Sequence, residues 1–115
     1  MHWFHCICYF FGGTFFANTI PHLVSGLLGR PFQSPFAKPR GRGLSSATVN
    51  VLWGWVNLVL GYSLIFHVGH FNARSMSDAI SMGLGILAIG LMLARFFGRV
   101  HGGNLPKDSI DNAKS

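Results

Sequence analysis

Polar side chains that could do chemistry interrupt two apolar segments of this chain. The stretch ANTIPHLVSG places Asn18 and His22 inside a run of aromatic and aliphatic residues. Asn50 and Asn57 stand in the next apolar segment, at a spacing that puts both on one helix face. If the two segments are antiparallel helices rising ~1.5 Å per residue, His22 reaches the level of Asn50, and Asn18 lies within a turn of Asn57. The sequence therefore predicts a polar cluster of these four residues.

Two roles are open for this polar cluster. Asparagine and histidine can hydrogen-bond between helices that pack through small residues, and Gly54 and Gly61 share the helix face of the two asparagines. The same four side chains could instead bind a small polar ligand or a lipid headgroup, with His22 as the ionisable member.

Histidines near the ends of the apolar segments form a second candidate group. They occur in two pairs at i, i+3 spacing, and four imidazoles on one side could bind zinc, copper or haem iron. Two cysteines, Cys6 and Cys8, lie two positions apart and point to different faces of a helix, so they do not strengthen this interpretation. We expect no metal or other cofactor from the sequence. The candidates for such a site are His2, His5, His67 and His70.

Motifs of enzyme active sites are absent from the sequence. There is no G-x-S-x-G, no H-E-x-x-H and no glycine loop for a phosphate. The chain has only three acidic residues, of which Asp78 is the only one near an apolar segment. Because paired carboxylates are missing, the sequence predicts a protein that is not an enzyme.

Composition favours lipid as the solvent for most of the chain. Half of the residues (50%) are hydrophobic and 10% are charged, whereas about a quarter are charged in an ordinary soluble domain. Three apolar segments, at about 4–28, 46–67 and 76–98, each have the ~20 residues that a helix needs to cross a bilayer. Helices satisfy their own backbone hydrogen bonds in lipid. The predicted fold is therefore all-α, with three transmembrane helices.

Basic residues predict the orientation of these helices. Eight of the nine lysines and arginines fall either between the first and second segments or at and beyond the end of the third. Only Arg74 lies between the second and third segments. By the positive-inside rule the N-terminus is outside and the C-terminus is cytoplasmic. The net charge of +6 is thus explained without nucleic acid, and the polar tail, 101–115, is expected to be disordered.

The segment 30–45 is predicted to be a basic loop at the lipid surface. It repeats a Pro-Phe pair and then carries lysine and arginine, so aromatic rings could enter the interface while the cations meet anionic headgroups. The residues expected to contact lipid are Arg30, Phe32, Phe36, Lys38, Arg40 and Arg42.

Local signals indicate where the helices begin and bend. Ser45 or Ser46 could cap the second helix, and the SMSD stretch resembles a capping box in which Ser75 and Asp78 bond each other's backbone. Pro21 removes a backbone hydrogen bond from the first helix, which is expected to be kinked or re-entrant. The third helix carries two ridges of small residues that could pack inside the protomer or against a copy of it. These ridges are Ser77, Ser81 and Gly85, and Gly90, Ala94 and Gly98.

Three stretches of the chain resemble a known group of proteins. GGTFFAN, PHLVSGLLGRPFQSPF and GLSSATVNVLWGWVNLVLGY are similar to segments of small, uncharacterised bacterial integral membrane proteins, over roughly Gly12 to Tyr62. The resemblance implies a multi-pass protein of the bacterial inner membrane. It implies no substrate, cofactor or catalytic residue.

The function expected from these observations is that of a non-enzymatic membrane component. It would be an accessory or scaffold subunit, or a homo-oligomer, with lipids and either copies of itself or a larger membrane complex as partners, and without nucleic acid. An alternative is an oligomeric carrier or channel for a small solute, lined by Asn18, His22, Asn50 and Asn57. A further alternative is a haem- or metal-binding membrane subunit that uses the four histidines.

Overall fold

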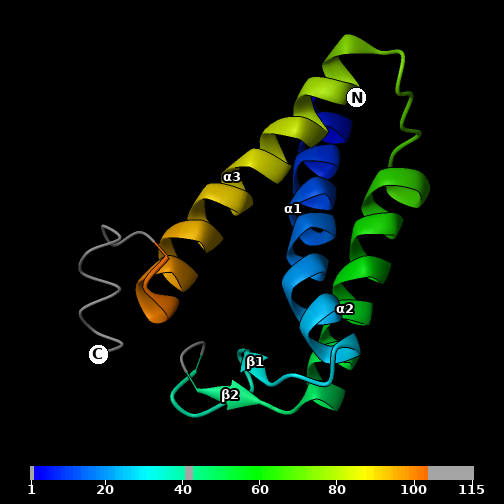
Figure 1. Cartoon of the computed structure of the whole chain (residues 1–115). Coiled ribbons are helices and arrows are strands. Elements are labelled where there is room, and N and C mark those ends of the chain that lie inside the picture. The colour runs from blue at the N-terminus through cyan, green and yellow to red at the C-terminus, as the bar shows by residue number, and fades with distance from the viewer. Residues whose placement is uncertain (1, 41–42, 104–115) are drawn as a thin grey trace.

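The protein is built from three long helices joined by one structured loop. The structure is a computed structural model and describes residues 2–40 and 43–103. Helix α1 spans His2–Leu27, α2 spans Ala47–Tyr62 and continues into the π-helix η1, Ser63–Val68, and α3 spans Met76–His101. The two short strands of the loop, β1 (Phe32–Gln33) and β2 (Leu44–Ser45), pair antiparallel. Figure 1 shows these elements. The expected helical fold is confirmed, and the small hairpin is an addition to it.

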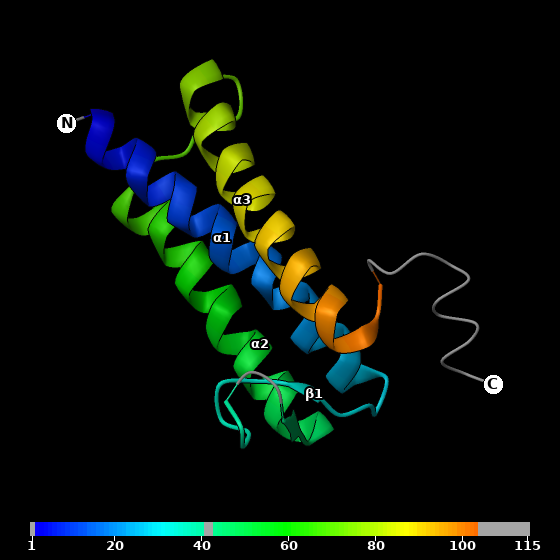
Figure 2. The same ribbon diagram turned by 90° about the vertical axis from the view of Figure 1, so that its left-hand side faces the viewer.

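Helix α1 is the centre of the molecule. It packs against both α2 and α3, which contact each other far less (Figures 1 and 2). In Figure 1 the chain runs down through α1, up through α2 and down again through α3, so the N-terminal ends of α1 and α3 lie at the same end as the α2–α3 connection. The basic loop lies at the opposite end. Of the tail expected to be disordered, residues 104–115 lie outside the described part of the chain.

Serine side chains begin α2 and α3. The Ser46 hydroxyl accepts a hydrogen bond from the Val49 N–H at 3.2 Å, and the Ser75 hydroxyl accepts one from the Asp78 N–H at 3.4 Å. The second half of the predicted capping box is different, because the Asp78 carboxylate accepts from the Asn72 N–H at 3.1 Å. The carboxylate therefore fastens the preceding turn onto the first turn of α3.

Helix α1 continues through Pro21 without interruption. Pro21 lies inside a helix that ends only at Leu27, so the re-entrant arrangement expected as one possibility is not present. The helix stops where Gly29 adopts a positive φ of 71°. There the Arg30 N–H bonds the Ser25 carbonyl at 2.9 Å, which closes the end of the helix as in a Schellman turn.

Polar and small residues are buried while large apolar ones face outward. The buried residues of α2 are Asn50, Gly54, Asn57 and Gly61, the four that the sequence places on one face. In contrast, α2 and α3 expose leucine, isoleucine and valine side chains along their outer surfaces. Extended apolar surfaces of this kind are uncommon on monomeric soluble domains.

Two helical segments have the length and composition to cross a membrane. They are Ala47–Val68, with 22 residues and a mean hydropathy of 1.5, and Met76–His101, with 26 residues and a mean hydropathy of 2.0. Helix α1 is also 26 residues long, but its histidines, glycines and asparagine make it less apolar. Two of the three predicted spans thus satisfy this criterion.

Glycines allow the helices to approach closely. Gly85 of α3 lies against the backbone of Phe10, with no space for a Cβ atom, and Gly54 of α2 lies in tight contact with Leu23. Gly90, by contrast, has no atom within 4 Å of where a Cβ would stand. The first small-residue ridge of α3 therefore packs on α1 at Gly85, whereas Gly90 of the second ridge faces outward.

We expect Gly85→Ala to destabilise the fold and Gly90→Ala to leave it unchanged. The added methyl at Gly85 meets the rigid Phe10 carbonyl, and such overpacking costs about 1–3 kcal/mol. The measurement is thermal unfolding of both variants in mild detergent, followed by fluorescence-detected size exclusion. Equal loss of stability in the two variants would contradict this helix packing.

Candidate functional site

The Asn50 side chain is the centre of the predicted polar cluster. Its Oδ1 lies 2.8 Å from His22 Nδ1. Its Nδ2 donates toward the carbonyls of Phe32, Ser45 and Ser46 at 3.0–3.1 Å. An amide nitrogen has two N–H groups, so the three carbonyls share them. One side chain thus connects α1, both strands of the loop and the start of α2.

His22 is held in one orientation by this contact. Because Asn50 directs its Nδ2 at carbonyls, its Oδ1 is the acceptor and His22 Nδ1 carries the proton. In the neutral ring, Nε2 is then left as an acceptor. The imidazole also meets the edges of two aromatic rings, Phe32 at 5.6 Å and Trp53 at 6.4 Å between centroids. The ring is buried, with 3% of its surface exposed.

Asn18 and Asn57 form the second contact between α1 and α2. Asn18 Nδ2 donates to Asn57 Oδ1 at 3.0 Å, and Asn57 Nδ2 donates to the Trp53 carbonyl of its own helix at 2.8 Å. The structure therefore pairs the four residues as His22 with Asn50 and Asn18 with Asn57. Both pairs cross the same helix interface.

The two asparagines of α2 have no access to the surroundings. Asn50 is 0% and Asn57 is 1% exposed, and both side chains have hydrogen-bond partners inside the protein. Their donors and acceptors are engaged in holding the helices and the loop together. In this arrangement Asn50 and Asn57 are enclosed between the helices and the loop.

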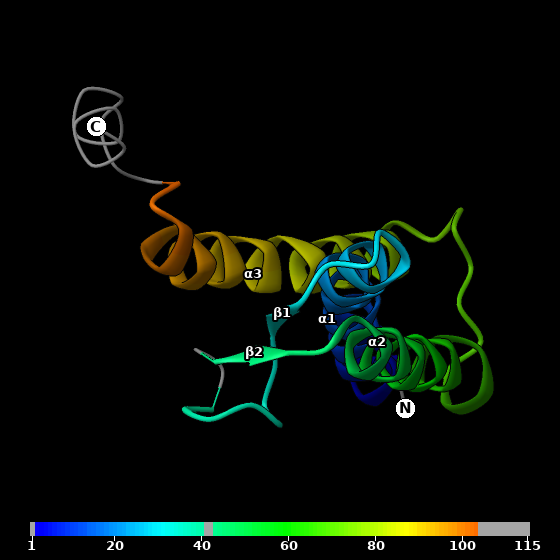
Figure 3. The ribbon, with the colours of Figure 1, turned by 60° about the horizontal axis from the view of Figure 1, so that its bottom comes forward.

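Asn18 and His22 also border a cavity of about 400 Å³. In Figures 1 and 3 the C-terminal half of α3 diverges from α1 and α2, and the cavity lies between these helices beside the loop. It has a mixed lining of aromatic rings, amides and one cation. Besides Asn18 and His22, the described lining residues are Gln33, Ser34, Pro35, Arg40, Trp53, Leu93, Phe96 and Phe97.

No pattern in the sequence indicates the contacts that close this cavity at its loop end. Gln33 Oε1 lies 3.0 Å from His101 Nε2, and the His101 ring stacks on Phe32. Phe97 also contacts Phe32, with 4.8 Å between ring centroids. These residues join the end of α3 to β1, although 68 positions separate His101 from Gln33.

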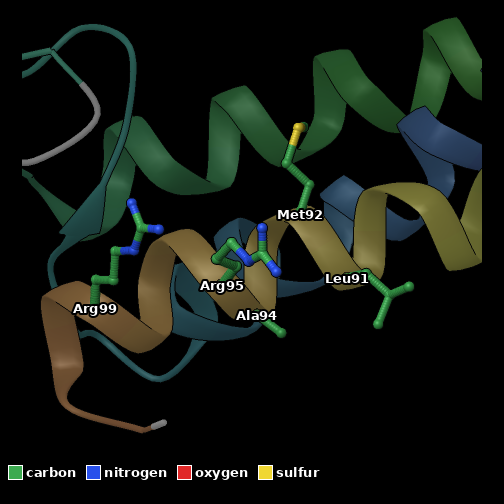
Figure 4. A pocket seen from close by; sticks show the side chains of 5 residues that line it. All are labelled: Leu91, Met92, Ala94, Arg95 and Arg99. Carbon is green, nitrogen blue, oxygen red and sulfur yellow. The ribbon is translucent and has the colours of Figure 1, made fainter.

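A larger surface hollow, of about 1020 Å³, lies along the C-terminal half of α3. Its described lining residues all come from this helix, as Figure 4 shows. They are Leu91, Met92, Ala94, Arg95 and Arg99. The hollow contains none of the predicted cluster residues, so its size does not make it the better candidate site.

The basic loop divides into an outer and an inner surface. Phe36 is 64% exposed, and Arg30, Lys38 and Arg40 are also exposed. Phe32 differs from the expectation that it contacts lipid, because its ring is turned inward onto His22 and Phe97. The pairing of β1 with β2 places it there. Arg42 lies outside the described residues.

The four candidate metal-binding histidines are not gathered into one site. His5 contacts the Tyr9 ring, and His67 contacts the Tyr62 ring. The backbone of His70 hydrogen-bonds the Tyr9 hydroxyl. Among residues 2–40 and 43–103, the one group of three or more potential ligands contains only His2 of the four.

Comparisons with known proteins add no assignment, because no protein-family model, curated protein or solved structure matches this chain.

We expect replacement of Asn50 to be more damaging than replacement of Asn18. Asn50→Ala removes the partner of His22 and of three carbonyls, and each unsatisfied buried group costs about 1–3 kcal/mol. Asn50→Asp keeps the shape but turns a carboxylate oxygen toward those carbonyls, so it is expected to be worse still. Asn18→Ala loses one interhelical bond, worth about 0.6 kcal/mol.

The measurement is the melting temperature in detergent, together with the amount of protein in the membrane. If all three variants retain the stability of the unchanged chain, the cluster does not hold the helices together.

Proposed function

We propose that this protein is a three-span membrane component without enzymatic activity, which acts by associating with other membrane-embedded helices. The observation that carries the proposal is the distribution of side chains on α3. In the most apolar 18-residue stretch of α3, only 11% is buried. Large apolar residues such as Leu87, Leu91 and Met92 are more than half exposed. A surface of this kind needs either lipid or another protein against it.

The length and position of α1 support its assignment as the third span. It has as many residues as α3, and a helix that rises ~1.5 Å per residue needs roughly 20 residues to cross a hydrocarbon core of ~30 Å. It lies between the two apolar helices and is in contact with both. If α2 and α3 cross the bilayer, α1 is carried through with them. Asn18 and His22 are then tolerated at membrane depth because they bond to α2.

The ends of the helices support the proposed orientation. The loop residues Arg30, Lys38 and Arg40 lie at the same end as Arg95 and Arg99 of α3. Arg74 lies at the other end, in the α2–α3 connection. The basic end is therefore proposed to be cytoplasmic and the N-terminus outside. Together with the resemblance described above, this orientation supports the proposal that the protein lies in a bacterial inner membrane.

The cavity beside His22 supports a second candidate function, the binding of a small amphipathic molecule. Asn18, His22 and Gln33 give it polar groups, and Trp53, Phe96 and Phe97 give it apolar walls. Such a mixed lining is typical of small-molecule sites. A carrier lined by all four cluster residues is less well supported, because Asn50 and Asn57 are enclosed.

Topology is tested with reporters that are active only outside the cytoplasm. We expect activity when the reporter is fused after His70 or ahead of α1, and no activity after Arg40 or after Ser115. An inactive N-terminal fusion combined with an active fusion after His70 would show that α1 does not cross the membrane. Activity after Ser115 would reverse the proposed orientation.

Association through α3 is tested by native mass spectrometry after gentle detergent extraction. We expect the unchanged chain to appear as an oligomer or in a larger complex, and Gly90→Trp to weaken that association at least tenfold. Gly90 has open space around it, so a tryptophan there projects from the outer face of α3 and obstructs a partner helix without disturbing the contact with α1. Leu52→Phe, at a 61% exposed position of α2, is the matched control and is expected to keep the assembly.

A chain that is monomeric and free of other proteins at every concentration would contradict the association. A small molecule that stays bound to the unchanged chain and is lost on His22→Ala would favour the second candidate function instead.

A further inference from the structure

The N-terminal ends of α1 and α3 bring together three side chains with metal-binding donor atoms. A ring nitrogen of His2, the sulfur of Cys6 and a carboxylate oxygen of Asp78 lie within 4.8 Å of one another. His2 and Cys6 are four residues apart on one face of α1, and Asp78 is in the first turn of α3. In Figures 1 and 2 these helix ends lie at the end of the molecule opposite the loop that carries β1 and β2.

Asp78 is a carboxylate without a full set of partners. It is 5% exposed, and it is the only acidic residue in the described part of the chain. Its Oδ2 accepts from the Asn72 N–H, but within residues 2–40 and 43–103 its buried Oδ1 has no hydrogen-bond partner. A buried charged oxygen in this state is costly unless a cation or a donor meets it.

We propose that His2, Cys6 and Asp78 bind a divalent transition-metal ion of the zinc class. Imidazole, thiolate and carboxylate are the ligands that Zn²⁺ takes in proteins. Ligand atoms on a tetrahedral zinc lie about 3.3–3.8 Å apart, so the three side chains need to close by about an ångström. Three protein ligands leave a fourth position for water or for a group from another molecule.

The surroundings of His2 suit this role. His2 is exposed, and its Nε2 lies 2.8 Å from the Ser77 hydroxyl, a contact that favours one orientation of the ring. Metal-bound histidines commonly have such a partner on the ring nitrogen that does not bind the metal. In the proposed site Nδ1 is then the ring nitrogen left for the metal. Ser77 and Asp78 are adjacent, so α3 supplies both a direct ligand and the group that positions another one.

Charge balance is also favourable. The positive ends of two helix dipoles meet here, and they disfavour an uncompensated cation. The Cys6 thiolate and the Asp78 carboxylate together supply the two negative charges that neutralise a divalent ion. Bound metal would cross-link the first turn of α1 to the first turn of α3. The site goes beyond the proposed function and does not depend on it.

The test uses the full chain in mild detergent, with a histidine-free affinity tag at the C-terminus. After removal of metal with a chelator under reducing conditions, Zn²⁺ is titrated and the bound metal is measured by elemental analysis. Co²⁺ serves as a second probe, because a thiolate ligand produces a charge-transfer absorption band. We expect one ion per chain, a cobalt–thiolate band and a higher melting temperature with Zn²⁺.

Matched variants identify the ligands. Cys6→Ala and Asp78→Asn are expected to weaken Zn²⁺ binding by about a hundredfold or more, and Cys6→Ala is expected to abolish the cobalt–thiolate band. Ser77→Ala is expected to weaken binding about tenfold, as for other groups that orient a ligand. Cys8→Ala and His5→Ala, which alter the neighbouring cysteine and histidine, are expected to bind as the unchanged chain does.

The proposal is wrong if Cys6→Ala binds Zn²⁺ as well as the unchanged chain, or if Cys8→Ala loses as much binding as Cys6→Ala. Because Asp78 also fastens the turn before α3, Asp78→Asn is judged only if it elutes as a folded species. Cys6→Ala removes only one thiol, so its Zn²⁺ affinity tests the proposed site independently of the Asp78→Asn variant.

Discussion

The hydrogen bonds of one amide, Asn50, are the interaction on which the end of the fold that carries the basic loop depends. Without water around it, a buried amide must find all of its partners in the protein. Asn50 finds them in His22, in β1, in β2 and at the start of its own helix. The loop is thereby fixed against the helices. Phe32 is fixed with it, and the end of α3 rests on Phe32 through Phe97 and His101.

Close packing on α1 explains why the outer surface is so apolar. Glycine at positions such as 54 and 85 lets neighbouring backbones touch, so little side-chain surface is needed between the helices. The large side chains of α2 and α3 are consequently free to point outward. In lipid this costs nothing, because hydrocarbon tails are as apolar as leucine.

The two ends of the bundle use polar groups differently. At the basic end the donors and acceptors of the cluster are matched, so the histidine and asparagines stabilise the helix contact. At the other end Asp78 retains an oxygen without a partner among the described residues, next to an imidazole and a thiol. Polar groups that all have hydrogen-bond partners stabilise a structure, whereas a buried carboxylate oxygen without a partner favours binding of a cation. This difference distinguishes the hydrogen-bonded cluster from the proposed metal site.

The sequence by itself determined the helices and the shared face of Asn50, Gly54, Asn57 and Gly61, because periodicity and helix rise depend only on local geometry. The same geometry placed His22 beside Asn50. Only the tertiary structure decided that Phe32 turns inward, that the end of α3 meets β1, and that Cys6 lies with Asp78 rather than with the other histidines. These contacts join residues distant in the chain across helices whose rotation and divergence are set by packing. Contacts of this kind produce no periodic pattern in the sequence from which they could be predicted.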